Sequence, residues 1–329
     1  MRYVDVCNGD ADGLIARHQF RLSFPIPGGT LALITGAKRE VTLLSRVDTG
    51  SVARDATDIS VFDISYDQNA AHARLLLDAG ATIHYFDHHR AGNLRSHPRL
   101  HAHIDTSAHI CTSLIVDRHL DGTHRPWAIA AAFGDNLTAI AEQLASNANL
   151  STMQTMLLRQ LGECINYNAY GESTSDLHYH PEEIARRMMP YESPFEFAQR
   201  EDILQHLLTG YADDMQRAQA VLPHHESLHT AVYMLPDEPW ARRVSGALAN
   251  LLARTNPQRA HAVLSCAADA TYTVSIRAPL NNPQGADTIA IQFPDGGGRA
   301  AAAGINNLAS QEIPHLIALV DDTYGATTG

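Results

Sequence analysis

The stretch HYFDHHRAG, residues 84–92, decides how the rest of the chain is interpreted. A run of β-forming residues, 81–86, ends directly in Asp87, His88 and His89. Open α/β sheets bind their ligands in the crevice beyond the carboxyl ends of the strands, and imidazole and carboxylate groups suit Mn²⁺, Fe²⁺ or Zn²⁺. The stretch therefore predicts a metal site, although an isolated Asp-His-His sequence also fits a polar turn with surface histidines.

Length and composition indicate an ordinary globular protein. With 329 residues, 45% of them hydrophobic, the chain is long enough for one very large domain or two ordinary ones with a full core. Its net charge of −12 does not favour a long phosphate backbone, because polymer binding usually requires a basic stripe. The charge therefore argues against long duplex nucleic acid as a partner, and leaves a small substrate or a locally positive cleft as the alternatives.

The cysteines and the N-terminal residues bear on the cellular location. The four cysteines lie far apart and form no C-x-x-C pair, which argues against a disulfide framework and a thiolate zinc site. The chain begins with a strand-like stretch without an apolar signal core, and no stretch approaches roughly 18 uncharged apolar residues. We expect a cytoplasmic protein without membrane contact.

Strands alternate with helical stretches along the first third of the chain. The expected strands are residues 3–7, 31–34, 57–63 and 81–86, and the expected helices are residues 14–22 and 68–79. This alternation predicts an α/β protein with a parallel sheet and right-handed crossovers.

Several predicted strand ends carry acidic side chains. Asp10 and Asp12 follow the first strand, Asp63 ends the third, and Asp87 follows the fourth. A further acid, Asp135, ends an otherwise apolar run. Carboxylates gathered at one sheet edge repel one another unless a cation lies between them, so such a cluster either binds metal or costs stability.

The DADG sequence at residues 10–13 has two other interpretations. One of its aspartates would only cap the following helix. A calcium loop of the EF-hand kind is disfavoured, because Gly13 directly follows the second aspartate and the next acid is Glu40.

Taken together, these motifs resemble the DHH phosphoesterases. This superfamily includes RecJ-like exonucleases, nanoRNA and phosphoadenosine-phosphate phosphatases, cyclic-dinucleotide phosphodiesterases, family II pyrophosphatases and prune-type exopolyphosphatases. The motifs occur in the family's order: D-x-D-G at 10–13, the acid Asp63, the tripeptide at 87–89 and G-D ending at Asp135. Residues 296–304 look like the G-G-G-H-x-x-A-A-G signature of the DHH-associated domain.

The resemblance implies an α/β fold of two domains. A parallel-sheet DHH catalytic domain would span residues 1–189, a helical linker 190–225, and a smaller α/β DHH-associated domain 226–329. The residue pattern predicts one long helix over 195–222 and an irregular segment at 164–171. The substrate would lie in the cleft between the domains, and a homodimer is left open.

The resemblance also implies two Mn²⁺ ions, with Mg²⁺ or Co²⁺ as alternatives. Asp10 would hold the first ion and Asp63 would bridge the two. The second ion would be held by Asp12, His88 and Asp135. Two such ions lower the pKa of a shared water, which then attacks phosphorus.

Two catalytic roles follow from the same resemblance. Asp87 would fix the tautomer of His88 through its free ring nitrogen. His89 would face the substrate phosphate.

One position in the first strand departs from the family pattern. The family usually has a histidine four residues before the first aspartate of D-x-D, and this chain has Val6. Asn8, Cys7 or a water would then complete the first ion, or the protein would work with one ion, or it would bind without cleaving. Cys7 is otherwise interpreted as a small buried hydrophobe.

The C-terminal third predicts a phosphate-binding loop. The consecutive residues Gly296, Gly297 and Gly298 let backbone N–H groups converge on an anion, and a flexible turn is the alternative. Arg299 stands where the family usually has histidine, and its guanidinium suits bidentate phosphate contact. Arg277 resembles the family arginine that contacts substrate phosphate.

We therefore expect a metal-dependent phosphohydrolase that cleaves short phosphate esters, such as oligonucleotides of a few residues, nucleoside bisphosphates or linear dinucleotides. An exopolyphosphatase is one alternative, because that branch uses the same metal chemistry. A degenerate, non-catalytic nucleotide-binding protein is a second alternative, because the histidine at position 6 is missing.

Overall fold

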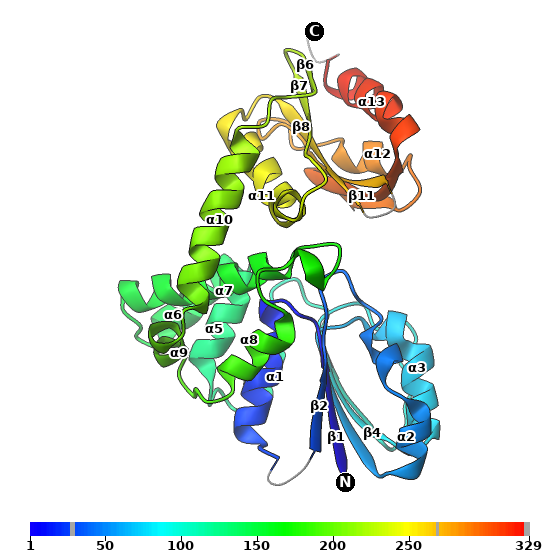
Figure 1. Cartoon of the computed structure of the whole chain (residues 1–329), viewed down its shortest axis with the longest axis vertical. Coiled ribbons are helices and arrows are strands. Elements are labelled where there is room, and N and C mark those ends of the chain that lie inside the picture. The colour runs from blue at the N-terminus through cyan, green and yellow to red at the C-terminus, as the bar shows by residue number, and fades with distance from the viewer. Residues whose placement is uncertain (27–29, 268–269, 326–329) are drawn as a thin grey trace. The chain divides into compact units, whose positions relative to one another are not determined.

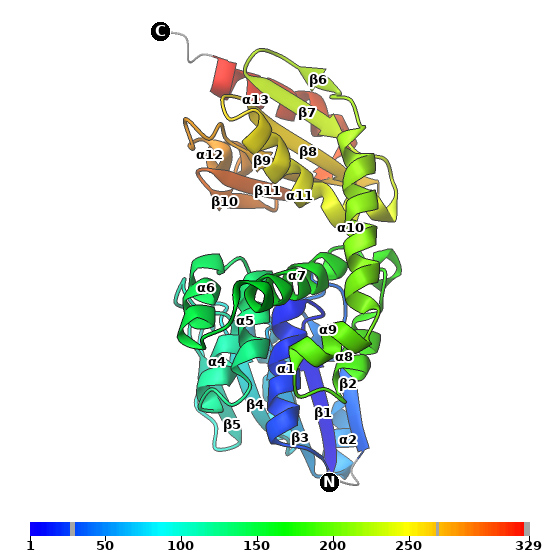
Figure 2. The ribbon, with the colours of Figure 1, turned by 90° about the vertical axis from the view of Figure 1, so that its left-hand side faces the viewer.

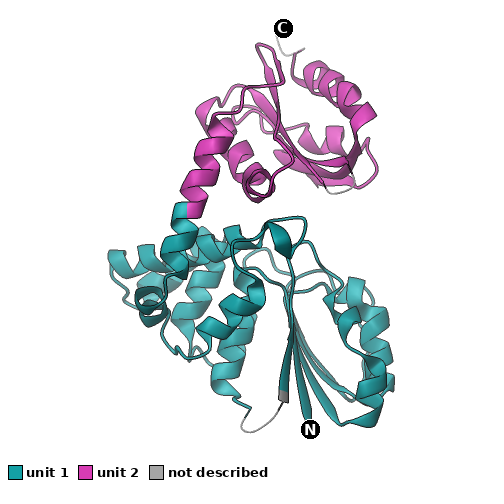
Figure 3. Cartoon of the chain, viewed as in Figure 1, with its two compact units in different colours: residues 1–209 teal, residues 210–329 magenta. Residues whose placement is uncertain are grey.

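The computed structural model describes residues 1–26, 30–267 and 270–325, which divide into two compact units, Met1–Thr209 and Gly210–Gly329 (Figures 1 and 3). The division falls inside helix α10 (Ile203–Gln219), within the segment expected to be a linker. The predicted single long helix over 195–222 is wrong. Two helices, α9 (Pro194–Arg200) and α10, occupy this segment, and the backbone is extended at Glu201.

The segment between α9 and α10 is held by ion pairs with an arginine. Arg187 donates from Nε to the Glu201 carboxylate at 2.6 Å and from Nη2 to Asp202 at 2.5 Å. These two acids therefore face Arg187 of helix α8 (Pro181–Met188) and do not continue the α9 helix.

Unit 1 is built on a parallel sheet, which confirms the predicted fold class. Its strands are β1 (Arg2–Cys7), β2 (Thr30–Ile34), β3 (Thr57–Phe62), β4 (Thr82–Asp87) and β5 (Leu100–Ile104). They pair in the order β2-β1-β3-β4-β5, and every pairing is parallel. From β1 the chain goes to β2 on one side and then returns to β3 on the other side of β1, so the strand order changes direction between β1 and β3. Open α/β sheets bind their ligands beyond the carboxyl ends of the strands at such a switch point.

Helices cover both faces of this sheet (Figures 1 and 2). One face carries α2 (Thr49–Arg54), α3 (Tyr66–Asp78) and the short helix η1 (Leu43–Arg46). The other carries α1 (Ala11–Ser23), α4 (Thr112–His119), α5 (Arg125–Gly134), α6 (Thr138–Asn147) and α7 (Thr152–Ala169). The expectation of an irregular segment over 164–171 is wrong for its first six residues, because α7 continues to Ala169.

The two faces of the sheet are buried in different ways. Toward α3, alternate strand residues such as Val4, Val6 and Ile59 form an apolar cluster. Toward α1, β1 buries Asp5, whose carboxylate pairs with two arginines of α1 at 2.8 and 2.5 Å. This buried ion group fixes α1 against β1, and therefore fixes the turn that joins them.

Helices α5 and α7 approach closely through a glycine. A Cβ at Gly162 would lie 1.8 Å from the carbonyl oxygen of Ala130, and a Cβ at Gly134 would lie 2.7 Å from Cβ of Ala11. Only glycine permits this separation. The C-terminal end of α5, with Asp135, is thereby held beside the start of α1.

Unit 2 has a mixed sheet in the order β10-β11-β9-β8-β7-β6. Its strands are β6 (His225–Glu226), β7 (Thr230–Met234), β8 (Ala260–Cys266), β9 (Thr271–Arg277), β10 (Gly296–Arg299) and β11 (Ala302–Ala309). Helix α11 (Pro239–Thr255) covers one face, and α12 (Ala286–Ala290) and α13 (Ile313–Gly325) cover the other (Figure 1). The glycine run expected to be a loop instead forms strand β10, paired antiparallel with β11.

Candidate metal centre

The side chains that the sequence singles out in unit 1 lie beyond the carboxyl ends of β1, β3 and β4 and at the end of α5. They are Asp10, Asp12, Asp63, Asp87, His88, His89 and Asp135. Four of the five carboxylates are at most 2% exposed. Aspartate is almost never buried to this extent without a partner, so each contact of these groups is informative.

The start of α1 fixes the first two acids. Asp10 is the N-cap of α1, and its Oδ1 accepts from the backbone N–H of Gly13 at 3.0 Å. Asp12 points to the start of α4, where it accepts from the N–H groups of Thr112 and Ser113, each at 2.7 Å. A helix N-terminus offers unpaired N–H groups and a partial positive charge, which stabilise the buried carboxylate.

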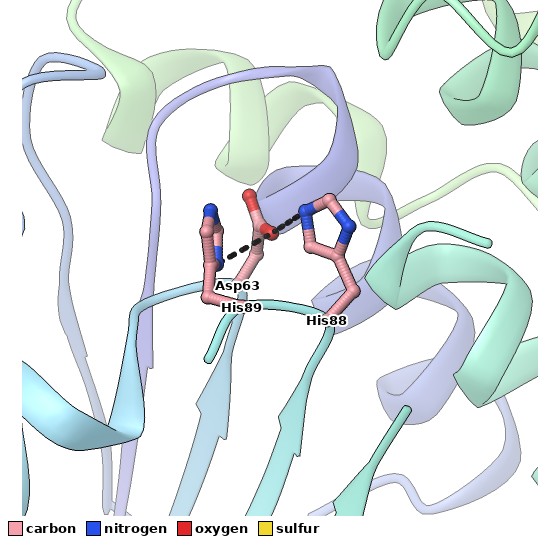
Figure 4. A group of neighbouring side chains, drawn as sticks. All are labelled: Asp63, His88 and His89. Carbon is pink, nitrogen blue, oxygen red and sulfur yellow. Dashed lines mark ion pairs between the residues drawn. The ribbon is translucent and has the colours of Figure 1, made fainter. Parts of the chain in front are cut away.

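Asp63 lies at the centre of the group. Its backbone is left-handed, with φ of 59°, a conformation that aspartate tolerates better than most residues. Its Oδ1 accepts from the hydroxyl of Thr112 at 3.0 Å and lies 3.4 Å from Nε2 of His88 and 4.0 Å from Nδ1 of His89. Figure 4 shows Asp63 between the two imidazole rings.

The two histidines are oriented by different partners. Nδ1 of His88 donates to the carbonyl oxygen of Ile110 at 3.1 Å, which leaves Nε2 facing the carboxylates. Nδ1 of His89 donates to Asp87 at 2.8 Å, and Asp87 also accepts from the N–H of Tyr66. The expected contact of Asp87 with His88 is therefore replaced by one with His89. The backbone N–H of His89 also donates to Asp87, at 3.2 Å.

Two sets of side chains bring potential ligand atoms within 4.8 Å of one another. One set is Asp12, His88 and Asp135, and the other is Asp63, His88 and His89. Carboxylate with imidazole suits Mn²⁺, Fe²⁺ or Zn²⁺. Nδ1 of His88 already donates to the carbonyl oxygen of Ile110, which leaves Nε2 to bind an ion. The two sets therefore compete for the same nitrogen atom of His88.

The pKa values in the group reflect a shortage of positive charge. Burial, followed by the charges of Asp12 and Asp10, raises the pKa of Asp63 well above its usual range. Burial and Asp12 raise the pKa of Asp135 to about 7. Burial alone would lower the pKa of His88, but hydrogen bonding to Asp63 and the charge of Asp12 raise it to about 10. A divalent cation among these groups would relieve the repulsion, so the donor set of Asp12, His88 and Asp135 fits a metal ion.

The position expected for the first ion does not fit one. Val6 is fully buried in the apolar cluster on the α3 side, and burial raises the pKa of the Cys7 thiol to about 12. The side-chain oxygen of Asn8 accepts from the N–H of Asp10 at 3.3 Å. None of these residues offers Asp10 an additional ligand. Instead, Nζ of Lys38 lies 2.6 Å from Oδ2 of Asp10.

Lys38 was not predicted as a site residue. It follows β2 (Thr30–Ile34). Burial by itself would raise the pKa of Asp10, but the charge of the Lys38 ammonium and its hydrogen bond lower this pKa below its usual value. Lys38 lies four residues after a strand of the same sheet, which is a weak indication of a site residue. Residues 35–42 match no motif, so the sequence gives no stronger one.

The two arginines predicted to bind phosphate in unit 2 share one face of its sheet. Pairing across β10, β11 and β9 aligns Arg299 with Ala302, and Ala302 with Arg277. Directly opposite residues point to the same side of a sheet, so two arginines flank Ala302. Arg277 also donates to Asn250 of α11 at 2.7 Å. Gly297 lies two residues before Arg299 in β10 and therefore faces the same side of the sheet. A Cβ at Gly297 would meet nothing within 4 Å, so this part of the face is open.

The other two glycines are held closely. A Cβ at Gly296 would lie 1.8 Å from the carbonyl oxygen of Ala290, and Gly298 has φ of 146° and approaches Ala303. Both glycines are required by the backbone, whatever their role in binding.

Comparison with solved structures defines the fold. No family model and no curated relative matches the chain. The chain is similar to exonuclease RecJ bound to manganese, with a TM-score of 0.61 and 16% identity over 99% of this chain and 90% of that one. It is also similar to the DHH domain of a member of the s1p family of ribosomal proteins, with a TM-score of 0.66 and 12% identity over 98% and 86% of the two chains.

A third similar structure is RecJ of Thermus thermophilus in complex with Mn²⁺, with a TM-score of 0.63 and 15% identity. The match covers 98% of this chain and 52% of that protein, so this chain spans about half of its length. These likenesses show that the chain shares the fold of RecJ and of the DHH domain, as the sequence motifs predict. No described helix combines the length and apolar character needed to span a membrane.

Proposed function

We propose that the protein is a metal-dependent phosphohydrolase of the DHH type, with its catalytic centre in unit 1. One observation carries this proposal: Asp12, His88 and Asp135 bring ligand atoms within 4.8 Å at the switch point of the sheet. Buried carboxylates assembled in this way cost stability without a cation. The similar RecJ structures are described with Mn²⁺ or Mg²⁺, which supports a divalent ion here.

Each side chain has a distinct task in this proposal. Asp12, His88 and Asp135 hold the ion, and Asp63 lies beside it. A divalent ion in this position supplies Lewis acidity and lowers the pKa of a water molecule. The ring of His89 is 44% exposed and is held by Asp87, so its free nitrogen can contact a phosphate oxygen.

The proposed substrate is a short phosphate ester, such as an oligonucleotide of a few residues, a nucleoside bisphosphate or a linear dinucleotide. Arg277 and Arg299, on one face of unit 2, would bind phosphate, because arginine forms bidentate contacts with phosphate oxygens. Backbone N–H groups near Gly297 would have an open approach. The net charge of −12 argues against a long polyanion.

The test is hydrolysis of bis-p-nitrophenyl phosphate while Mn²⁺ is titrated into chelator-treated protein. We expect Mn²⁺-dependent turnover that falls by more than about 100-fold in Asp63→Asn, because that change removes a charge next to the ion. Asp105→Asn is the matched control. Asp105 also follows a strand, but its carboxylate contacts Ser107 and Arg118, outside the cluster, and the substitution leaves its backbone hydrogen bond to Asp87 in place. Parent protein without Mn²⁺-dependent turnover would instead support a non-catalytic nucleotide-binding protein.

A substrate panel then narrows the class. Phosphoadenosine phosphate, dinucleotides and polyphosphate should be compared by kcat/KM, with Arg277→Gln as a variant. A preference for the first two substrates supports the proposal. A preference for polyphosphate supports the exopolyphosphatase alternative, which uses the same metal chemistry.

A further inference from the structure

Lys38 is the only lysine in the chain, which has 24 Lys and Arg residues in total. Other buried carboxylates among the described residues pair with arginine, for example Asp117 with Arg125 and Asp214 with Arg243. The two side chains are not equivalent, because the lysine ammonium is a compact point charge and the guanidinium is a broad planar fork. The single lysine therefore places a compact point charge on Asp10.

The ammonium of Lys38 is held in place from three sides. Nζ lies 2.6 Å from Oδ2 of Asp10 and donates to Oδ1 of Asn166 at 3.1 Å. It also lies 5.4 Å from the ring centroid of Tyr170, a cation–π distance. The backbone N–H of Lys38 donates to the carbonyl oxygen of Ala169 at 3.0 Å, which ties its loop to the end of α7.

Both carboxylate oxygens of Asp10 already have a partner. Oδ1 of Asp10 accepts from the N–H of Gly13, and Oδ2 is used by Lys38. On the α3 side of β1, the apolar side chain of Val6 is packed into the core. The surroundings of Asp10 therefore offer few additional metal ligands, and Lys38 already balances the negative charge of Asp10.

We propose that the ammonium of Lys38 takes the place of the first metal ion, so that the centre holds one divalent ion at Asp12, His88 and Asp135 and a fixed organic cation at Asp10. This inference rests on the proposed function. An ammonium has three N–H donors, and Lys38 directs two of them to Asp10 and Asn166. Its side chain is 28% exposed, so the third N–H can donate to a phosphate oxygen of the substrate.

The test is the number of Mn²⁺ ions bound per chain, measured by equilibrium dialysis and elemental analysis, with the electron paramagnetic resonance spectrum of the bound Mn²⁺. We expect one ion per parent chain, with the hyperfine pattern of an isolated Mn²⁺. Lys38→Met keeps the length of the side chain without its charge, and combined with Val6→His it also restores an imidazole. We expect this double variant to bind two ions with the multiline spectrum of an exchange-coupled pair.

Arg39→Met is the matched control, because Arg39 is the adjacent cation and its pairing with Glu172 lies at 3.7 Å. It should remain at one ion. Two ions in the parent would overturn the role of Lys38 and leave the proposed function standing. No bound ion in the parent would overturn both. A double variant that stays folded and binds only one ion would also overturn the role of Lys38.

A second measurement covers the case in which the double variant does not fold. Protein labelled with ¹³C-lysine gives one set of lysine side-chain signals, because Lys38 is the only lysine. With excess Mg²⁺ added to the parent, we expect the ε-methylene signal to keep the linewidth and shift of an ordered side chain. Narrowing to the values of free lysine would mean that an ion displaces the ammonium, and would contradict the inference.

Discussion

Asp135→Asn is expected to stabilise the metal-free protein and to abolish its stabilisation by Mn²⁺. Asp135 is the C-cap of α5, and asparagine keeps its shape while removing its charge. The pKa of Asp135 is raised from 3.8 to about 7 by burial and then by Asp12. A shift of this size corresponds to roughly 4 kcal/mol above pH 7. Because the side chain is partly exposed and solvent screens its neighbours, we expect about 2 kcal/mol.

The sign follows from proton binding. Between pH 3.8 and about 7 the folded state holds a proton on Asp135 that the unfolded state has released, so stability falls as pH rises through this window. The asparagine variant lacks this loss. The difference in free energy of unfolding between the variant and the parent should therefore be largest at pH 8 and less than half as large at pH 5.

The assay is urea unfolding of chelator-treated protein, followed by tryptophan fluorescence. The chain has two tryptophans, and Trp127 is fully buried in α5 of unit 1. In a Trp240→Phe background the signal reports unit 1 alone. A variant that is less stable than the parent at pH 8 without metal would refute the reasoning, as would a gain of equal size at pH 5.

Added Mn²⁺ should reverse the order of stability. A ligand at 100 times its dissociation constant stabilises the folded state by about 2.7 kcal/mol. The parent should gain this energy, and Asp135→Asn should gain little, because one of its three ligands is neutral. Asp105→Asn serves as the control and should follow the parent throughout.

Three further predictions concern the scaffold. Asp5→Ala leaves two buried arginines of α1 without their carboxylate and should lower the free energy of unfolding by about 3–5 kcal/mol in urea; a loss below about 1 kcal/mol would contradict this. Burial lowers the pKa of His18 to about 3, so the folded state resists its protonation, and stability should fall as pH drops from 6.5 toward 3; His18→Gln should flatten that dependence, and an unchanged pH profile would count against it. Gly296→Ala should lower the melting temperature of unit 2, because the added Cβ would lie 1.8 Å from a backbone oxygen of α12. Gly297→Ala should leave the melting temperature unchanged, because its Cβ would meet nothing within 4 Å. Equal melting temperatures of the two variants would contradict the close packing of Gly296 against α12.

The parallel sheet and most of the acid cluster were predictable from the sequence. Strands 3–7, 57–63 and 81–86 alternate with a helix-forming pattern, and parallel strands bring their carboxyl ends to one edge of the sheet. Acids at three strand ends were therefore bound to meet. The position of Asp135 depends on the close approach of α5 to α7 and α1 through Gly162 and Gly134, which the local sequence pattern does not encode.

Other features depend on contacts that no local pattern encodes. Lys38 follows an edge strand and joins the cluster only because α7 lies beside its loop. Strand β10 contains three glycines, which have low β propensity, and pairing with β11 overrides that preference. The expected contact of Asp87 with His88 is wrong, because the carbonyl oxygen of Ile110 takes Nδ1 of His88 and Asp87 binds His89 instead.

The most direct test of the metal centre is the position of the ion in crystals grown with Mn²⁺, located by anomalous scattering. We expect one strong peak within roughly 2–2.5 Å of ligand atoms of Asp12, His88 and Asp135. A peak elsewhere, or no peak with these side chains ordered, would contradict the assignment of this cluster as the catalytic centre.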